Sequence, residues 1–330
     1  MHPFVKYPGG KAKELPLIQK YLPKQIHRYF EPFVGGGAVF LGLSVDESYI
    51  NDYSKDLILL YVFLKQNDDE FRSYLLALNN LWKKTASKKL KRTELPTFLS
   101  FEKYEKYLST SLKRKETTIA NFSKKGVEVS AEDKKKIIIT ANKTSIYMLI
   151  RDLYNDSSNE KLHIAGYYFM REYCYSSMFR FSNNGKFNVP YGGMSYNDKN
   201  LDSKIEYMFS TTLRSKLLKA EINNYDFEVF LKQYSFKDND FIFLDPPYDS
   251  EFSTYDQNNF DKNEQKRLKT AISTIKAKWM LVIKKTDFIE SLYHDFYVYE
   301  YDKNYNVSFK NRNDREVKHL LITNYDIRKG

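Results

Sequence analysis

The feature that most constrains the fold is a largely apolar run at residues 240–244, which is followed at once by Asp245-Pro246-Pro247-Tyr248. A short apolar run is typical of a strand that is buried on both faces, as in a parallel sheet covered by helices. Two consecutive prolines cannot continue that strand, because they lack amide donors and have a fixed φ. The sequence therefore predicts a buried strand that ends in a rigid turn. Open α/β sheets bind ligands beyond such strand ends.

The amino-terminal part shows the same local order twice: a short apolar run, a break and a helical pattern. Residues 29–33 form a run that ends at the glycines 35–37, and an apolar segment follows. A second run at 49–50 is followed by helical spacing at 57–64. Two successive β-α units predict a parallel sheet.

Strand-like runs return near the carboxyl end, with amphipathic segments between them. We predict strands at 279–283, 297–301 and 319–325, and helices at 262–276 and 288–294. The middle of the chain differs, because residues 66–143 are lysine-rich with helical spacing and residues 167–193 are dense in aromatics, Asn, Gly and Arg. The predicted fold is α/β and Rossmann-like with a mostly helical insertion. Its parts are 1–64, an inserted 65–207, and 208–330.

Charge and cysteine content limit the partners and the compartment. The net charge of +11 and the pI near 9.2 favour a polyanionic partner, although a solvated basic surface is the plain alternative. The single cysteine, Cys174, cannot form an internal disulfide and indicates a reducing compartment. No signal-peptide pattern and no apolar run of about eighteen residues is present, so we expect a cytoplasmic protein away from membranes. The His and Cys residues lack zinc-ligand spacing, and no metal is predicted.

The turn at 245–248 has the chemistry to activate an exocyclic amine. Adenine N6 is a poor nucleophile, because its lone pair is delocalised into the ring. The Asp245 carboxylate and the Pro246 carbonyl could each accept one N6 hydrogen and aim the lone pair at a methyl donor. Tyr248 would stack on a flipped base. A Pro-stiffened surface turn is the structural alternative.

The glycine cluster and the acidic residue after the second run predict a cofactor site. Gly35 and Gly37 permit positive φ and close approach of a ligand to the backbone, next to Phe33. Asp52 is placed to accept the ribose hydroxyls of an adenosyl group. Glycine turns also serve nicotinamide, flavin and phosphate sites, and an Asp in this position is often a helix cap.

Residues near the amino terminus predict a contact with an anionic group. Tyr7 and Gly9 precede Lys11, and a helical segment follows at 13–21. A helix amino end with a lysine suits a group such as the methionine carboxylate of S-adenosylmethionine. An ordinary Pro-Gly turn is the alternative.

Together these motifs resemble the Dam-like, alpha-group N6-adenine DNA methyltransferases, which include methylases of restriction-modification systems. The resemblance implies a Rossmann-like fold that binds S-adenosylmethionine. The residues predicted to bind it are Tyr7, Gly9, Lys11, Phe33, Gly35, Gly37, Asp52 and Asp245. The resemblance also implies that Asp226 and Phe227 contact the adenine ring of the cofactor. In the wider group, Asp in first place of the turn at 245–248 indicates adenine, Ser commonly indicates cytosine N4, and Asn indicates protein or RNA.

The resemblance also identifies residues that would bind DNA. Segments 175–180 and 187–192 resemble the family's loop that enters DNA near the target, with Asn-Gly common where this chain has Ser176-Ser177. Arg180 would read a guanine, and Tyr175 would wedge into the base stack. The structural alternative is that Tyr175 and Met178 are core contacts under this loop. The remaining predicted DNA contacts are Ser176, Met178 and Pro190 in this region and the phosphate-binding Arg312 and Arg315.

We predict a monomeric enzyme that methylates N6 of a flipped-out adenine in double-stranded DNA by direct in-line transfer from S-adenosylmethionine. No Cys or Ser is placed by motif as a nucleophile, so no covalent intermediate is expected. A cognate restriction endonuclease acting on the same site is the expected second partner. The alternatives are N4-cytosine methylation, a catalytically inactive basic DNA-binding protein and, remotely, a dinucleotide-dependent oxidoreductase.

Overall fold

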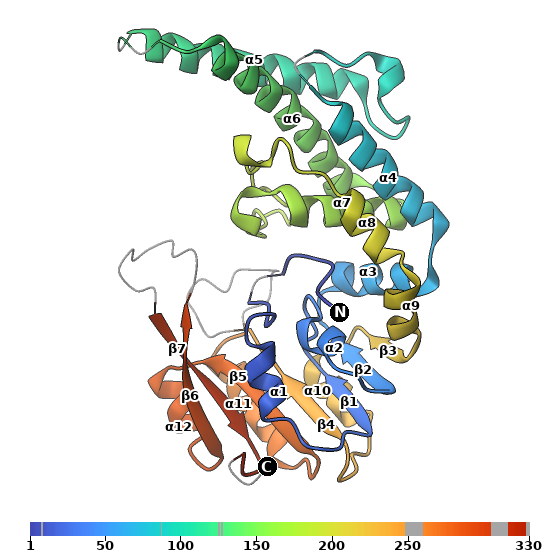
Figure 1. The fold of residues 1–330 in the computed structure, drawn as a ribbon, viewed down its shortest axis with the longest axis vertical. Helices are drawn as coiled ribbons and strands as arrows, with labels where there is room; N and C mark the ends of the chain where they lie inside the picture. The colour runs from blue at the N-terminus through green and yellow to red at the C-terminus, as the bar shows by residue number, and fades with distance from the viewer. Residues whose placement is uncertain are drawn as a thin grey trace. The chain divides into compact units, whose positions relative to one another are not determined.

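The fold is described from a computed structural model of the 330-residue chain. It describes residues 1–7, 9–86, 88–124, 126, 128–247, 260–304 and 316–327. The chain divides into two compact units (Figure 1). The sheet unit comprises Met1–Pro3, Gly9–Tyr61 and Ser215–Gly330, and the helical unit comprises Phe4–Pro8 and Val62–Arg214.

The two boundaries of the long segment Val62–Arg214 fall inside helices, α3 (Lys55–Gln66) and α9 (Thr211–Leu218). The predicted division after residues 64 and 207 lies a few residues away from them. The prediction relied on changes in composition, and composition does not change at the residue where a continuous helix passes from one unit to the other. No pattern in the sequence indicated that segment 4–8 belongs with the insertion, where the Tyr168 hydroxyl donates to the Phe4 carbonyl at 3.2 Å.

A seven-stranded sheet in the order β3-β2-β1-β4-β5-β7-β6 forms the sheet unit. β7 is antiparallel to both β5 and β6, and the pairs among β3, β2, β1, β4 and β5 are parallel. The strands are β1 (Arg28–Glu31), β2 (Glu47–Asn51), β3 (Ala220–Asn223), β4 (Phe241–Leu244), β5 (Lys278–Lys284), β6 (Tyr297–Asn304) and β7 (Glu316–Thr323).

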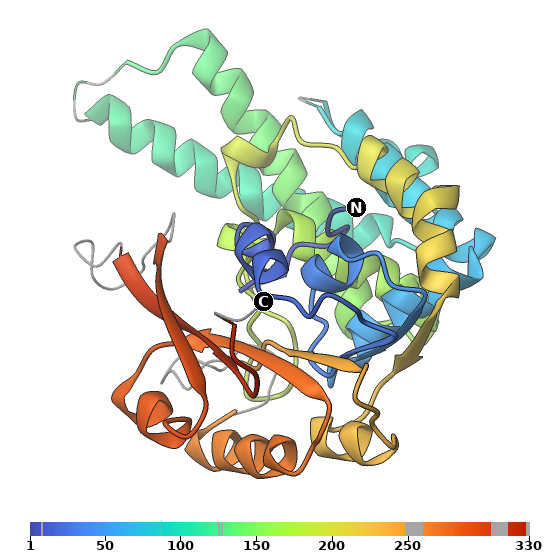
Figure 2. The ribbon, with the colours of Figure 1, turned by 60° about the horizontal axis from the view of Figure 1, so that its bottom comes forward.

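One face of this sheet packs on α10 (Phe227–Lys232), α11 (Lys262–Ser273) and α12 (Asp287–Leu292), which lie together in Figure 2. The shared core contains alternate strand residues such as Phe30, Ile242 and Leu281. The opposite face is covered by α1 (Leu15–Lys20) and α2 (Ala38–Gly42). Burial on both faces explains why β4 is apolar at every position, as the sequence predicted.

β3 is the strand that sequence analysis missed. It has the sequence Ala-Glu-Ile-Asn, and only its first residue is buried. It lies beside β2 at the edge of the sheet that the described residues form, and within that sheet β2 is the one strand it pairs with. An edge strand needs no continuous apolar run, so its sequence carries little strand signal.

The helical unit is built mainly from α4 (Asp69–Lys84), α5 (Phe101–Lys124), α6 (Ala131–Asp156), α7 (Glu160–Tyr173) and α8 (Asp202–Met208). Short 3-10 helices lie at Arg92–Glu94, Tyr175–Ser177 and Met194–Tyr196. Its core is aromatic, with Trp82 in contact with the rings of Phe169, Tyr173 and Tyr191. Side chains of Asp68, Ser130 and Asn159 cap α4, α6 and α7.

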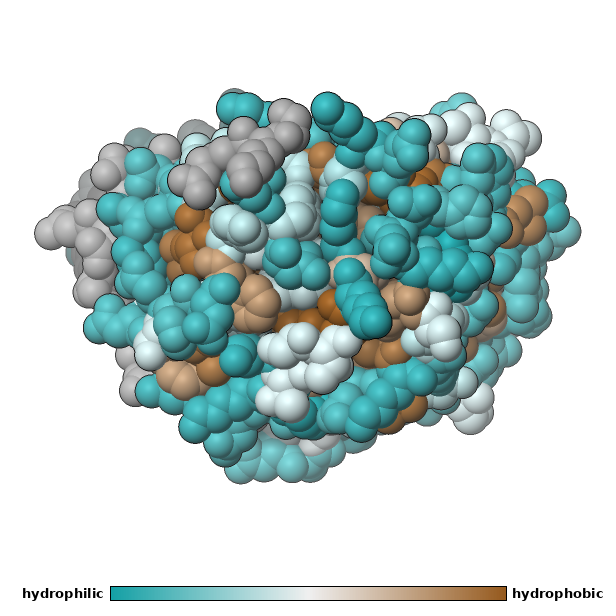
Figure 3. Space-filling view, turned by 90° about the horizontal axis from the view of Figure 1, so that it is seen from below, coloured by the Kyte–Doolittle hydropathy of each residue, from teal (hydrophilic) through white to brown (hydrophobic). Residues whose placement is uncertain are grey.

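The face drawn in Figure 3 is mostly hydrophilic, with apolar residues in small groups. Among the described residues, no helix combines the length and the apolar character that crossing a bilayer requires.

Candidate active site

The turn at residues 245–247 begins where β4 ends, in the middle of the sheet. β4 runs parallel to β1 with Ile242 opposite Phe30, so the two strands end at the same edge. The register puts Asp245 next to the loop that follows β1. Pro246 is buried and Asp245 is half-buried. The sequence predicted that the turn lies at the carboxyl end of a buried strand, the edge where open α/β sheets bind ligands.

Lys11 makes an ion pair with Asp245. Its Nζ lies 2.5 Å from Asp245 Oδ1 and also donates to the Gly9 carbonyl at 2.9 Å. The lysine side chain is 2% exposed, whereas that of Asp245 is 20% exposed. A buried ammonium must be paired, and here its partner is the predicted catalytic carboxylate. Lys11 was predicted to bind the cofactor, and its contact with Asp245 was not foreseen.

The glycine loop after β1 is held by side chains from elsewhere in the sheet unit. Gly35 and Gly37 have φ values of 48° and 72°, a region that favours glycine. The Tyr61 hydroxyl donates to the Gly35 carbonyl at 3.1 Å, and a Cβ on Gly37 would lie 2.4 Å from that hydroxyl. Asp52 accepts from the Gly35 amide at 2.9 Å and from the Ser54 amide at 3.0 Å. The Asp52 carboxylate is therefore oriented against the loop before any ligand arrives.

Two side chains that sequence analysis did not assign stabilise the same corner. Glu31, at the end of β1, accepts from the Tyr29 hydroxyl at 2.7 Å and from the Phe40 amide at 3.0 Å. Burial raises the pKa of Glu31 well above its usual range. Asn51 donates to the Pro32 and Tyr225 carbonyls, both at 3.0 Å, and so ties the loops after β1 and β3 together. Each is the polar last residue of a strand, and this position was the feature of the sequence that could have identified Glu31 and Asn51.

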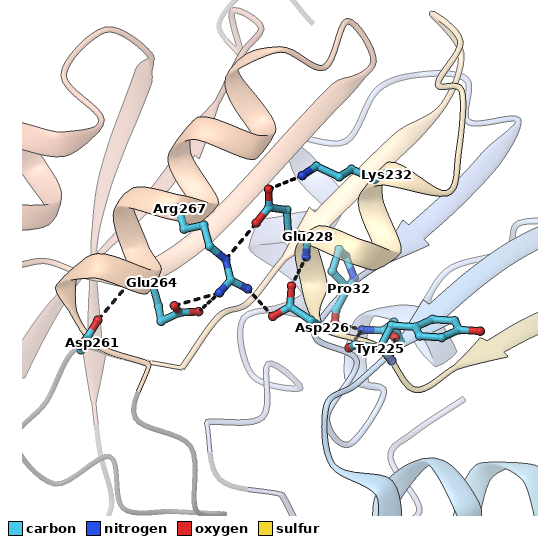
Figure 4. A network of polar contacts seen from close by, with 9 residues as sticks. Pro32, Tyr225, Asp226, Glu228, Lys232, Asp261, Glu264 and Arg267 are labelled. Atoms are coloured by element: carbon cyan, nitrogen blue, oxygen red, sulfur yellow. Dashed lines mark hydrogen bonds and ion pairs between the residues drawn. The ribbon is translucent and has the colours of Figure 1, made fainter.

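Asp226 and Phe227 open α10, and Figure 4 shows Asp226 beside Arg267 of α11. Asp226 caps α10 through the Glu228 amide at 2.9 Å and forms an ion pair with Arg267. The Phe227 ring is buried, with the half-buried ring of Phe33 at 5.5 Å and the Arg267 guanidinium at 4.3 Å. Arg267 was not predicted, because its role depends on the contact between two helices.

Tyr7 and the predicted DNA-entering loop belong to the helical unit. The Tyr7 ring lies against the buried Arg171 guanidinium at 4.7 Å. In the loop, the Tyr175 amide donates to the Pro190 carbonyl at 2.9 Å, and Arg180 Nε donates to the Asn188 side chain at 3.2 Å. The contact of Tyr7 with the cofactor stays a prediction.

The loop exposes most of the residues predicted to bind DNA. Tyr175, Ser176, Arg180 and Pro190 are exposed, and Met178 is half-buried. The alternative that Tyr175 is a core residue is wrong, because its side chain is 48% exposed. Three further predicted residues, Tyr248, Arg312 and Arg315, lie outside the described residues.

The sheet order, the glycine loop after β1, the acidic residue after β2 and the Asp-Pro-Pro turn after β4 define a Rossmann-like methyltransferase fold. The model of the D12 class N6 adenine-specific DNA methyltransferases matches residues 7–307, and the chain belongs to this family. The predicted fold class, reaction and adenine specificity are confirmed at the level of the family.

Curated relatives extend along almost the whole chain. It is 27% identical to the Type II methyltransferase M.CviBI of Paramecium bursaria Chlorella virus NC1A, over 98% of this chain and 100% of the relative. It is 26% identical to the Type II methyltransferase M1.LlaDCHI of Lactococcus lactis subsp. cremoris, over 98% and 96%. The DNA adenine methylase of Escherichia coli (strain K12) is 23% identical over 80% of this chain and 73% of the relative.

Proposed function

We propose that this chain transfers a methyl group from S-adenosylmethionine to N6 of an adenine flipped out of duplex DNA. The observation that supports the residue assignment best is the position of Asp245 and Pro246 at the carboxyl end of β4, beside the loop of Gly35 and Gly37. A side-chain acceptor and a backbone acceptor in sequence match the two hydrogens of an exocyclic amine.

Asp245 and Pro246 act on the amine in two ways. Their oxygens accept the N6 hydrogens, which localises the lone pair and directs it along the line of attack. The Asp245 carboxylate also stabilises the positive charge that develops on N6 as the new bond forms. Lys11 pairs with Oδ1 of Asp245 and so holds this carboxylate at the end of β4. Tyr248 is proposed to stack on the target base.

The residues around the glycine loop have the chemistry that S-adenosylmethionine requires. The cofactor supplies a methyl group that is electrophilic because it is bonded to a positively charged sulfur. Asp52 is oriented by two backbone amides, and a carboxylate accepts hydrogen bonds from ribose hydroxyls. Asp226 presents a carboxylate that is 34% exposed, and it suits an adenine amine. Gly35 and Gly37 lack the Cβ atoms that would hinder close approach of a ligand.

The exposed loop of the helical unit, at residues 175–180 and 187–192, is proposed to bind duplex DNA. Arg180 is proposed to read a base edge, and Tyr175 to fill the space of the flipped adenine. The names of the two Type II relatives support a role in a restriction-modification system, with an endonuclease that cuts the same unmethylated site as the partner.

The test is methyl transfer from labelled S-adenosylmethionine to duplex oligonucleotides, with the product nucleoside identified by mass spectrometry. We expect N6-methyladenine, and we expect Asp245→Asn to lower kcat at least about a hundredfold. Asp46→Asn is the matched control, because Asp46 is an exposed carboxylate paired with Lys219. N4-methylcytosine as the product, or an Asp245→Asn variant that works at the parental rate, would refute the proposal.

A further inference from the structure

α11 carries a fully buried amide that reaches the catalytic turn. Gln265 is 0% exposed and lies on the same helix as the core residues Leu268 and Ile272. Its Nε2 donates to the Pro247 carbonyl at 3.0 Å. Among the residues that the structure describes, its Oε1 has no hydrogen-bond partner. A half-satisfied amide costs stability in a core, so packing alone does not explain a glutamine here.

The turn needs an external donor because of its own composition. Pro246 and Pro247 have no N–H groups, so neither can donate a backbone hydrogen bond that would hold the turn. The peptide bond between the two prolines is planar, so only φ and ψ of Pro247 separate their carbonyl groups. The ring of Pro247 fixes φ. A bond that holds the Pro247 carbonyl therefore also restricts the direction of the Pro246 carbonyl.

Two residues further along α11, Arg267 holds the other part of the site (Figure 4). Its guanidinium pairs with Asp226, with Glu228 at 3.1 Å and with Glu264 at 2.9 Å. It also lies over the Phe227 ring. These three carboxylates converge on one cation, and they would repel one another without it.

We propose that α11 positions both reactants, with Gln265 acting through Pro247 on the acceptor of the target amine and Arg267 acting through Asp226 and Phe227 on the adenine of the cofactor. The inference rests on the proposed function and adds two positioning residues to it. Because the two side chains hold different parts of the site, their loss should change different kinetic constants.

Gln265→Met tests the first half, since methionine keeps the length of the side chain and removes its donor. We expect kcat to fall about tenfold to a hundredfold, while the Kd for S-adenosylmethionine changes by less than about threefold. Gln265→Glu gives a signature that packing alone would not give. A buried carboxyl group is readily protonated and can then donate to the Pro247 carbonyl. The activity of this variant relative to the parent should rise as the pH falls.

Arg267→Met tests the second half. We expect the Kd for S-adenosylmethionine, measured by calorimetry without DNA, to rise about tenfold, with kcat at saturating cofactor within about threefold of the parent. Arg267→Lys keeps the charge and loses the planar fork, so its Kd should be intermediate.

Ile272→Ala is the matched control, because Ile272 is as buried as Gln265 on the same helix. It should lower the unfolding temperature and leave kcat and Kd unchanged. A Gln265→Met variant with parental kcat, or an Arg267→Met variant with parental Kd, overturns the inference. A parent protein that binds the cofactor but methylates no adenine would refute the proposed function instead, and the calorimetric test of Arg267 would still stand.

Discussion

At the residue scale, the ion pair of Lys11 and Asp245 links the cofactor corner to the catalytic turn. Lys11 is almost fully buried, so its charge has to be balanced inside the protein. Asp245 provides that balance and is also the proposed acceptor of the target amine. The pair therefore holds the proposed catalytic carboxylate next to a cofactor-binding lysine.

We predict that Lys11 and Asp245 are energetically coupled. Lys11→Met and Asp245→Asn should each destabilise the fold, because each leaves the remaining charged group without its opposite charge. The double variant should lose less than the sum of the two, with a coupling energy of about 1–3 kcal/mol. Urea unfolding of the four proteins measures this, and additive losses would show that the pair does not contribute to stability.

A second prediction concerns Glu31. Burial raises its pKa in the folded protein, so the folded state keeps a proton that the unfolded state releases. Stability therefore falls as pH rises from the ordinary pKa of Glu toward the raised one, by up to about 1.4 kcal/mol per pH unit. Glu31→Gln lacks this titration and retains an acceptor for Tyr29 and Phe40. Its stability relative to the parent should increase as the pH rises above the ordinary pKa of Glu, and a constant difference would contradict the prediction.

Residues whose role follows from their place at a strand end could be predicted from the sequence. Asp52 and Asp245 come directly after apolar runs, and parallel strands bring such ends together. Gln265 and Arg267 could not be predicted in this way. Their helix was expected from its amphipathic pattern, but their partners are Pro247 and Asp226, far away in the sequence. Only the packing of α11 on the sheet determines these contacts.

At the element scale, the loop after α7 stores backbone strain in a defined place. Ser176 and Ser177 have φ values of 51° and 53°, in the left-handed region that glycine and asparagine tolerate best. Family members commonly have Asn-Gly at these positions, which suits the same conformation. Both serines therefore hold a backbone conformation that Asn or Gly would adopt with less strain.

Ser177→Gly should relieve this strain. We expect a gain of about 0.5 kcal/mol, because the relief of roughly 1–2 kcal/mol is partly offset by the greater freedom of glycine in the unfolded chain. Ser177→Val should destabilise, since a β-branched residue adopts positive φ poorly. Thermal unfolding of the two variants gives the comparison. If valine proved as stable as glycine, the left-handed conformation at Ser177 would be refuted.

At the scale of the whole molecule, the basic helices and the proposed catalytic residues lie in different units. The motifs for methyl transfer lie in the sheet unit, whereas α5 and α6 of the helical unit carry exposed basic residues such as Lys113, Arg114 and Lys134. Both patterns are visible in the sequence. For the basic helices, the sequence is compatible with a solvated face and with a DNA-binding surface. Binding to phosphates releases counterions, so the salt dependence of DNA affinity distinguishes the two.

We predict that replacing Lys113, Arg114 and Lys134 together by Gln reduces the slope of log K against log salt by up to about 2.7, at about 0.9 for each phosphate that is no longer neutralised. The control replaces the exposed Lys237, Lys266 and Lys276 of the sheet unit, which lowers the net charge equally. If the helices bind phosphates, only the first set changes the slope substantially. Equal changes would mean that overall charge alone attracts DNA, and an unchanged slope in the first set would assign α5 and α6 to the solvated surface.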